Sequence, residues 1–291
     1  MKSADESSVK NRGSSCLRPR DNSARYSKAV NNLYLTTAIE AAQAASKLHQ
    51  FYAGSDLGIS TKSSDIDLVT VVDKLCEEKI REIILAAHPD HVVLGEEGGQ
   101  SEGNASHRWI VDPLDGTVNY AHGFPFYSVS IGLEIDGVME VGVVIDSVRD
   151  EMFTATRGGG ALCNGKPVSV SSEPNLKKCL LATGFPYDEA GLRMNVDVFA
   201  RVQQKVRAVR RPGSAALDLA YVACGRTDGF WELKLNPWDV AAGMLLVQEA
   251  GGAVTGVHGE PYSVNDKKVV ASNGHIHGKL LAALELDVRT A

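Results

Sequence analysis

Residues 109–119 have the sequence WIVDPLDGTVN. The apolar start predicts a buried strand that ends at Asp112, because Pro113 has no N–H to continue a ladder. Asp115 and Gly116 predict a turn, which brings two carboxylates and the Leu114 carbonyl around a common point. Such oxygen ligands suit Mg²⁺ or Ca²⁺. Taken alone, the segment is explained equally well by an Asp-Gly turn with a side-chain hydrogen bond.

Carboxylates occupy similar positions in three other segments, which are DLVTVVD (67–73), VVLGEEGG (92–99) and NPWDVAAG (236–243). Glu96 follows an apolar strand. Asp73 and Asp239 fall in the first turn of predicted helices, where helix capping explains each of them by itself. Buried carboxylates gathered in one place repel one another unless cations neutralise them. A site with several metal ions therefore explains all four segments together.

In order and spacing, these segments resemble the inositol monophosphatase family over residues 30–288. The motifs that carry the resemblance are DLVTxxD, GEE, WxxDPLDGTxN and PWDVAAG. The resemblance implies an α+β fold layered as an α-β-α-β-α sandwich, and usually a homodimer. It also implies a Mg²⁺-dependent, lithium-sensitive phosphatase that acts on a small phosphorylated polyol, with inositol 1-phosphate as the common substrate. The segment around Asp239 resembles bacterial and plant-plastid members more than it resembles the animal cytosolic enzymes.

The resemblance also implies a ligand set for two metal ions, with a third, weaker ion on one of the same carboxylates. The implied metal ligands are Glu96, Asp112, the Leu114 carbonyl, Asp115 and Asp239. Thr117, hydrogen-bonded to Asp73, would orient the attacking water near the ion that Glu96 holds. These three residues, Thr117, Asp73 and Glu96, are therefore the expected catalytic group.

Substrate contacts are implied at two loops and two further carboxylates, which are Gly116, Thr117, Gly213, Ser214, Ala215, Glu232 and Asp239. The amides of Gly116 and Thr117 would hold the phosphate, while Glu232 and Asp239 would receive substrate hydroxyls. Lys62 is expected on a mobile loop that folds over the site, although a solvated lysine is the simpler interpretation of that residue.

The chemistry of phosphate-ester hydrolysis is consistent with such a site. Divalent ions can neutralise the phosphate, lower the pKa of water and stabilise the leaving oxygen, so that no covalent nucleophile is needed. Fructose 1,6-bisphosphate, histidinol phosphate and 3′-phosphonucleotides are alternative substrates of the same chemistry. A regulatory protein that binds a partner, with phosphatase activity secondary, is the alternative from another functional class.

Apolar periodicity predicts an alternation of helices and strands. Helices are expected at 29–53, 70–87, 190–206, 214–224, 238–250 and 276–286, and strands at 92–94, 109–111, 126–135, 138–146, 152–156 and 161–170. We expect one catalytic domain over 30–291, in two halves that meet at about 150–180. Residues 1–29 are Ser-rich and basic, which predicts a disordered tail or the remnant of a targeting segment.

Composition excludes several classes of protein. The 291 residues carry a net charge of −6, which disfavours a nucleic-acid binder that neutralises phosphates. No uncharged apolar run reaches the roughly 18 residues of a membrane span. The five cysteines are scattered without a CxxC pair, so neither a zinc site nor a disulfide framework is expected. A reducing, cytoplasmic location follows, with a plastid as the alternative if the tail is a transit-peptide remnant.

Overall fold

The computed structural model describes residues 22–55, 57–61 and 68–285. The α-helices are α1 (Asn22–Tyr52), α2 (Val71–Ala87), α3 (Thr117–Ala121), α4 (Glu189–Gln203), α5 (Ala215–Ala223), α6 (Pro237–Glu249) and α7 (His277–Leu284). The strands are β1 (Ser60–Thr61), β2 (Leu68–Val69), β3 (His91–Gly95), β4 (Gly99–Gln100), β5 (Asn104–Asp115), β6 (Ser128–Ile135), β7 (Val138–Asp146), β8 (Glu151–Thr156), β9 (Gly160–Cys163), β10 (Lys166–Pro167), β11 (Leu180–Thr183), β12 (Ala208–Arg210), β13 (Gly229–Leu233), β14 (Ala253–Thr255) and β15 (Lys268–Ser272).

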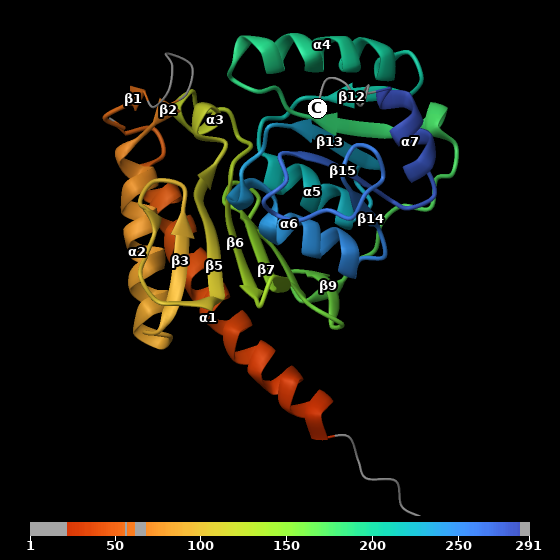
Figure 1. Ribbon diagram of the computed structural model, residues 1–291. Coiled ribbons are helices and arrows are strands. Elements are labelled where there is room, and N and C mark those ends of the chain that lie inside the picture. The colour runs from red at the N-terminus through yellow and green to blue at the C-terminus, as the bar shows by residue number, and fades with distance from the viewer. Residues whose placement is uncertain (1–21, 56, 62–67, 286–291) are drawn as a thin grey trace, which may run out of the picture.

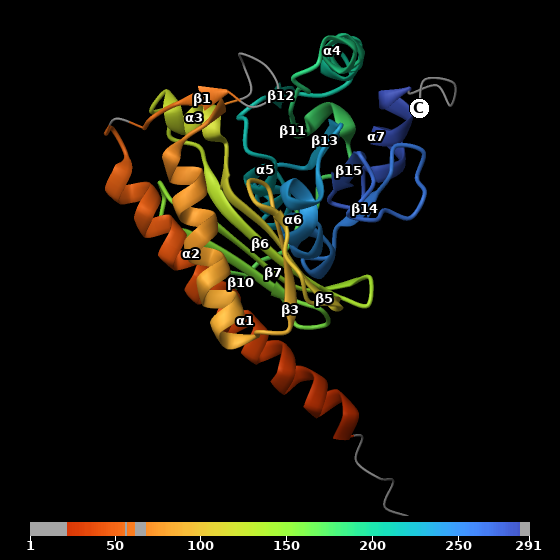
Figure 2. The ribbon, with the colours of Figure 1, turned by 60° about the vertical axis from the view of Figure 1, so that its left-hand side comes forward.

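The elements form five layers (Figures 1 and 2). One sheet has the strand order β10-β9-β8-β7-β6-β5-β3-β4, and the other has the order β12-β11-β13-β15-β14. Helices α1 and α2 cover the outer face of the first sheet, α5 and α6 lie between the sheets, and α4 and α7 cover the outer face of the second. This arrangement confirms the predicted α-β-α-β-α sandwich of the α+β class.

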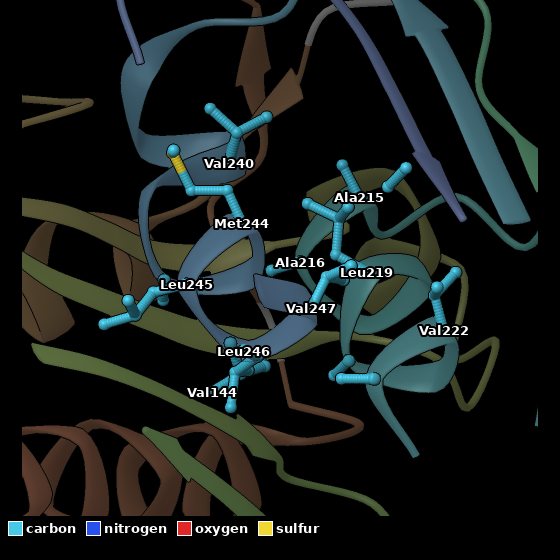
Figure 3. Packing of buried hydrophobic residues seen from close by; sticks show 14 of the residues in the cluster. Val144, Ala215, Ala216, Leu219, Val222, Val240, Met244, Leu245, Leu246 and Val247 are labelled. Atoms are coloured by element: carbon cyan, nitrogen blue, oxygen red, sulfur yellow. The ribbon is translucent and has the colours of Figure 1, made fainter. Parts of the chain in front are cut away.

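The central layer is largely apolar because a sheet covers each of its faces. Figure 3 shows α5 and α6 packed together, with Leu219 of α5 and Val247 of α6 in the interior. Leu246 of α6 and Val144 of β7 belong to the same buried cluster (Figure 3). Every residue of α6 from Val240 to Val247 is buried. The first turns of α5 and α6 lie at the candidate site, and the rest of each helix is packed in the buried interior.

Close packing between β7 and α6 depends on Gly142. A Cβ built on Gly142 would lie 2.8 Å from the Ala242 carbonyl oxygen and 3.1 Å from the Ala242 Cα, both of them backbone atoms that cannot rotate away. We expect Gly142→Ala to lower the free energy of unfolding by about 1–3 kcal/mol, as overpacking does.

The matched control is Gly278→Ala in α7, where an added Cβ meets nothing within 4 Å. Alanine is the better helix former there, so this variant should be neutral or more stable by up to about 1 kcal/mol. Urea denaturation of both variants tests the pair. Equal stability for the two would contradict the close approach of α6 to β7.

Several boundaries differ from the sequence-based expectation; the strand expected at 161–170, for example, is the two short strands β9 and β10. Strand β5 continues through Pro113 to Asp115, because Asp112 pairs with Ser130 and Asp115 with Ser128. Three steps along β5 match two along β6, so the missing N–H of Pro113 falls in a bulge. Helix α1 begins at Asn22, seven residues before the start expected at 29, since extending a formed helix costs little. Residues 1–21 lie outside the described residues.

The chain leaves the first sheet at β10, which ends at Pro167, and enters the second at β11, which begins at Leu180. Within the described residues, no helix has the length and apolar character that a membrane crossing requires.

Candidate active site

A cavity of about 700 Å³ lies where β3, β5 and β13 meet the first turns of α3, α5 and α6. Every residue that the sequence predicts to bind metal or substrate lines this cavity. These residues are Glu96, Asp112, Leu114, Asp115, Gly116, Thr117, Gly213, Ser214, Ala215, Glu232 and Asp239. They come from segments up to 143 positions apart in the sequence, so their meeting is a property of the fold. Lys62 lies outside the described residues.

The two aspartates of the DPLDGT segment accept hydrogen bonds from different parts of the chain. The Leu114 N–H donates to Asp112 Oδ1 at 3.0 Å, a side-chain turn bond at Asp112 rather than at the Asp115–Gly116 turn of the simpler interpretation. Asp115 Oδ2 accepts from Ser214 Oγ at 2.6 Å and from the Ala216 N–H at 2.7 Å. The Asp115 carboxylate therefore caps the N-terminus of α5, where the positive end of the helix dipole favours an anion.

Gly116 makes the turn from β5 into α3. Its φ of 96° lies in the left-handed region, which side chains with a Cβ rarely adopt. A Cβ there would also lie 3.0 Å from the carbonyl oxygen of Phe126. Both observations explain why glycine follows Asp115, and both Gly116 and Thr117 line the cavity.

Asp73 does not line the cavity, but it holds a residue that does. The Thr117 hydroxyl lies 2.9 Å from Asp73 Oδ1 and 3.0 Å from the Leu114 carbonyl oxygen, and it can donate to either. Asp73 Oδ2 accepts from the N–H and the hydroxyl of Thr70, which completes the predicted capping box of α2. The capping role and the contact with Thr117 therefore coexist in one carboxylate.

Asp239 also has two roles, because it caps a helix and lines the cavity. Its Oδ2 accepts from the Asn236 N–H at 2.6 Å, so it caps α6 as the simpler interpretation predicts. The same side chain lines the cavity. Capping uses one of the two carboxylate oxygens and leaves the other for a ligand.

Charge in the cavity is concentrated and negative. Burial raises the pKa of Asp112 well above its ordinary value, and the charges of Glu96, Asp115 and Asp239 raise it further. Burial, followed by Glu96, raises the pKa of Asp239 as well. The pKa of Asp115 rises to about 6 through burial, despite its hydrogen bonds from Ser214 and Ala216. Burial and the charge of Asp115 raise the pKa of Glu232 to about 8. A bound cation would relieve this repulsion.

In the parts of the chain that the structure describes, no three His, Cys, Asp or Glu side chains are gathered into a preformed metal site. The predicted ligands share one cavity without forming a finished coordination shell. Asp115 and Asp239 are in addition held by backbone amides of α5 and α6.

Sequence reasoning assigned no role to Asn119, which ends the motif. Its Nδ2 donates to the Phe126 carbonyl at 2.7 Å and to the Pro212 carbonyl at 2.8 Å. Asn119 thereby joins α3 to the loop before α5, and its place inside the motif was the available signal. Arg211 also lines the cavity, on the same loop.

His49 of α1 contacts the backbone of the DPLDGT segment at Pro113. Its Nε2 lies 2.9 Å from the Pro113 carbonyl and its Nδ1 lies 2.9 Å from Ser147 Oγ. A carbonyl can only accept, so these partners assign the proton to Nε2. His49 is fully buried, and burial lowers its pKa from 6.5 to about 4.

This burial predicts acid destabilisation. Between pH 6.5 and pH 4 the unfolded chain binds the His49 proton and the folded chain does not. The free energy of unfolding should therefore fall with decreasing pH across this window, by about 3 kcal/mol from His49. Urea denaturation at several pH values measures the slope, and His49→Gln should flatten it. An unchanged slope in the variant would exclude His49 as the source.

The model of the inositol monophosphatase family matches residues 31–288. The chain belongs to this family. It is 44% identical over 223 residues to "Phosphatase IMPL1, chloroplastic" of Arabidopsis thaliana, covering 74% of this chain and 60% of that protein. It is 43% identical over 234 residues to "Nus factor SuhB" of Pseudomonas aeruginosa, covering 78% and 86% respectively.

The structure of an inositol monophosphatase from Anabaena superimposes with a TM-score of 0.77 at 43% identity, and the match covers 86% of this chain and 94% of that one. Family membership confirms the resemblance seen in the motifs and supports phosphatase activity for this family member.

Proposed function

We propose that this chain hydrolyses a small phosphate monoester with Mg²⁺, and that inositol 1-phosphate is its substrate. The observation that carries the proposal is the burial of the Asp112 carboxylate, only 1% exposed, in a cavity that Glu96, Asp115 and Asp239 also line. Such an arrangement costs free energy in the folded chain unless a cation binds. A buried cluster of carboxylates is therefore expected in a site that binds metal ions and acts on an anionic substrate.

The donor set suits a hard divalent cation. It consists of the carboxylates of Glu96, Asp112, Asp115 and Asp239 with the Leu114 carbonyl, and two or three ions are expected. When bound, Mg²⁺ would neutralise the phosphate, lower the pKa of water and stabilise the leaving oxygen.

The chain itself would orient the reactants. A Thr117 hydroxyl that donates to Asp73 or to the Leu114 carbonyl keeps its lone pairs for a hydrogen of the attacking water. The amides of Gly116 and Thr117 would hold the phosphate. Glu232 and Asp239 would accept hydrogen bonds from substrate hydroxyls, and the segment Gly213–Ala215 would form the second wall.

A phosphate-release assay tests the proposal. Inositol 1-phosphate, fructose 1,6-bisphosphate, histidinol phosphate and 3′-phosphoadenosine would be compared by kcat/KM with Mg²⁺. We expect the highest value for inositol 1-phosphate, loss of release with EDTA and inhibition by lithium. A higher kcat/KM for another substrate would correct the substrate but keep the chemistry. Release that persists in EDTA would contradict the metal role.

A partner-binding role is the second candidate, because a relative 43% identical to this chain is named a Nus factor. Absence of Mg²⁺-dependent release from every substrate above would favour it. A cellular phenotype of the gene deletion that Asp112→Asn still rescues would separate such a role from catalysis.

We also propose a homodimer, as the family resemblance implies. Sedimentation equilibrium should give twice the chain mass of 31.1 kDa. A cytoplasmic location, with a plastid as the alternative, stays a prediction that microscopy of a tagged full chain would test.

A further inference from the structure

Helix α2 carries two buried carboxylates one turn apart. Asp73 holds Thr117, as described above, whereas Glu77 has no place in the proposed reaction. Its side chain is 4% exposed, and its oxygens face the segment that connects β3 to β4. That segment, residues 95–99, contains Glu96.

The backbone of segment 95–99 wraps around the Glu77 carboxylate. The Glu97 N–H donates to Glu77 Oε2 at 2.7 Å, and the Gly98 N–H donates to Oε1 at 2.8 Å. Any side chain at Gly95 would overlap the Glu77 carboxyl group, and a Cβ at Gly98 would lie 2.7 Å from Oε1. Both glycines are therefore required for the carboxylate to reach the backbone.

Arg81 completes the arrangement. Its Nε donates to Glu77 Oε1 at 2.8 Å, and its Nη1 donates to the Val93 carbonyl at 3.1 Å. Its Nη2 donates to the Gly99 carbonyl. The guanidinium thus balances the charge of Glu77 and joins α2 to both sides of segment 95–99.

Packing alone does not require this pair. Helix α2 already buries an apolar stripe of Val72, Cys76, Ile80 and Ile84. A buried ion pair is often no more stabilising than apolar side chains of similar volume. The carboxylate of Glu77 does what an apolar side chain cannot do, which is to accept hydrogen bonds from the successive backbone N–H groups of Glu97 and Gly98.

We propose that Glu77, supported by Arg81, is a positioning residue that keeps the Glu96 carboxylate in the active-site cavity against the repulsion of Asp112. The proposal rests on the proposed function, in which Glu96 binds a metal ion. Without Glu77, segment 95–99 would relax outward and the cation would bind more weakly. Hydrogen-bonded supports of metal ligands typically contribute 10–100-fold to metal affinity.

The test compares Glu77→Gln with Glu189→Gln. Glu189 forms the same i,i+4 pair with an arginine, Arg193, but on the exposed face of α4. Glutamine keeps the volume of Glu77 but turns an NH₂ group toward one of the N–H donors. Mn²⁺ alone would be titrated calorimetrically into each full-length protein, and hydrogen exchange of residues 95–99 would be followed by mass spectrometry.

We expect the Kd for Mn²⁺ to rise about 10–100-fold in Glu77→Gln and to stay unchanged in Glu189→Gln. Exchange in 95–99 should accelerate only in Glu77→Gln. A folded Glu77→Gln with wild-type Mn²⁺ affinity and wild-type exchange would overturn the positioning role. A wild-type chain that binds no Mn²⁺ and releases no phosphate would overturn the proposed function, and this inference with it.

Arg81→Lys decides the question if Glu77→Gln does not fold. Lysine keeps the positive charge beside Glu77 but loses the forked contacts to Val93 and Gly99. A Kd for Mn²⁺ that rises in this variant, with circular dichroism unchanged, supports the proposal. An unchanged Kd contradicts it.

Discussion

Asp112→Asn should lower kcat by about 10³-fold or more, which corresponds to roughly 4 kcal/mol of activation free energy. The proposed site uses the Asp112 carboxylate for both principal metal ions, so one substitution weakens both. Asparagine has nearly the same shape, and the change is therefore mainly one of charge. Steady-state phosphate release at saturating substrate and Mg²⁺ measures the effect.

The same substitution, Asp112→Asn, should not lower the stability of the folded chain. Asp112 is buried among Glu96, Asp115 and Asp239, whose charges raise its pKa, so neutralising it removes repulsion from the folded chain. We expect the melting temperature without metal to stay equal or to rise. Asp136→Asn is the control, because Asp136 is an exposed turn residue with φ of 50°, a conformation that asparagine also tolerates. Near-normal turnover of Asp112→Asn would exclude the shared-ligand role.

Thr117→Val should lower kcat by about 10²-fold or more. A loss of this size is typical when a group positioned for proton transfer is removed. Valine has the shape of threonine without the hydroxyl that contacts Asp73 and the Leu114 carbonyl. The attacking water would then lack its acceptor, while the amides of Gly116 and Thr117 would remain in place. We therefore expect KM to change much less than kcat.

Thr117→Ser provides the matched control, because serine restores the hydroxyl without the methyl group. It should recover most of the activity that Thr117→Val loses. Equal kcat values for the two variants would show that the hydroxyl has no part in orienting water. Circular dichroism of both variants would establish that α3 is retained.

Local patterns were sufficient for some of the elements that lie deep in the fold, although the buried strands β11, β13 and β15 had no predicted range. The apolar stripe from Val72 to Ile84 predicted α2 nearly to the residue, because burial on one face produces a helical period. The bulge at Pro113 could not be predicted, since it depends on how β6 pairs with β5. The early start of α1 was missed for a related reason, because composition alone does not show where a formed helix stops extending.

The predicted site residues lie around one cavity because their motifs follow strand ends and begin helices. Their individual environments were not predictable. Asp115 caps α5 through residues about a hundred positions away, and His49 reaches Pro113 from α1. Sequence motifs identify residue types, whereas such contacts depend on how the layers stack.

By itself, the sequence indicated an alternation of helices and strands through its hydrophobic periodicity, and its short motifs carried the family resemblance that implied the five-layer fold and the set of acidic residues, because periodicity and motifs are local properties of the chain. Only the tertiary structure decided that Glu77 and Arg81 hold the segment carrying Glu96, and that Asp73 caps a helix and also contacts Thr117. The physical reason is that a buried carboxylate takes its role from the donors around it. Those donors are brought to it by packing between distant segments.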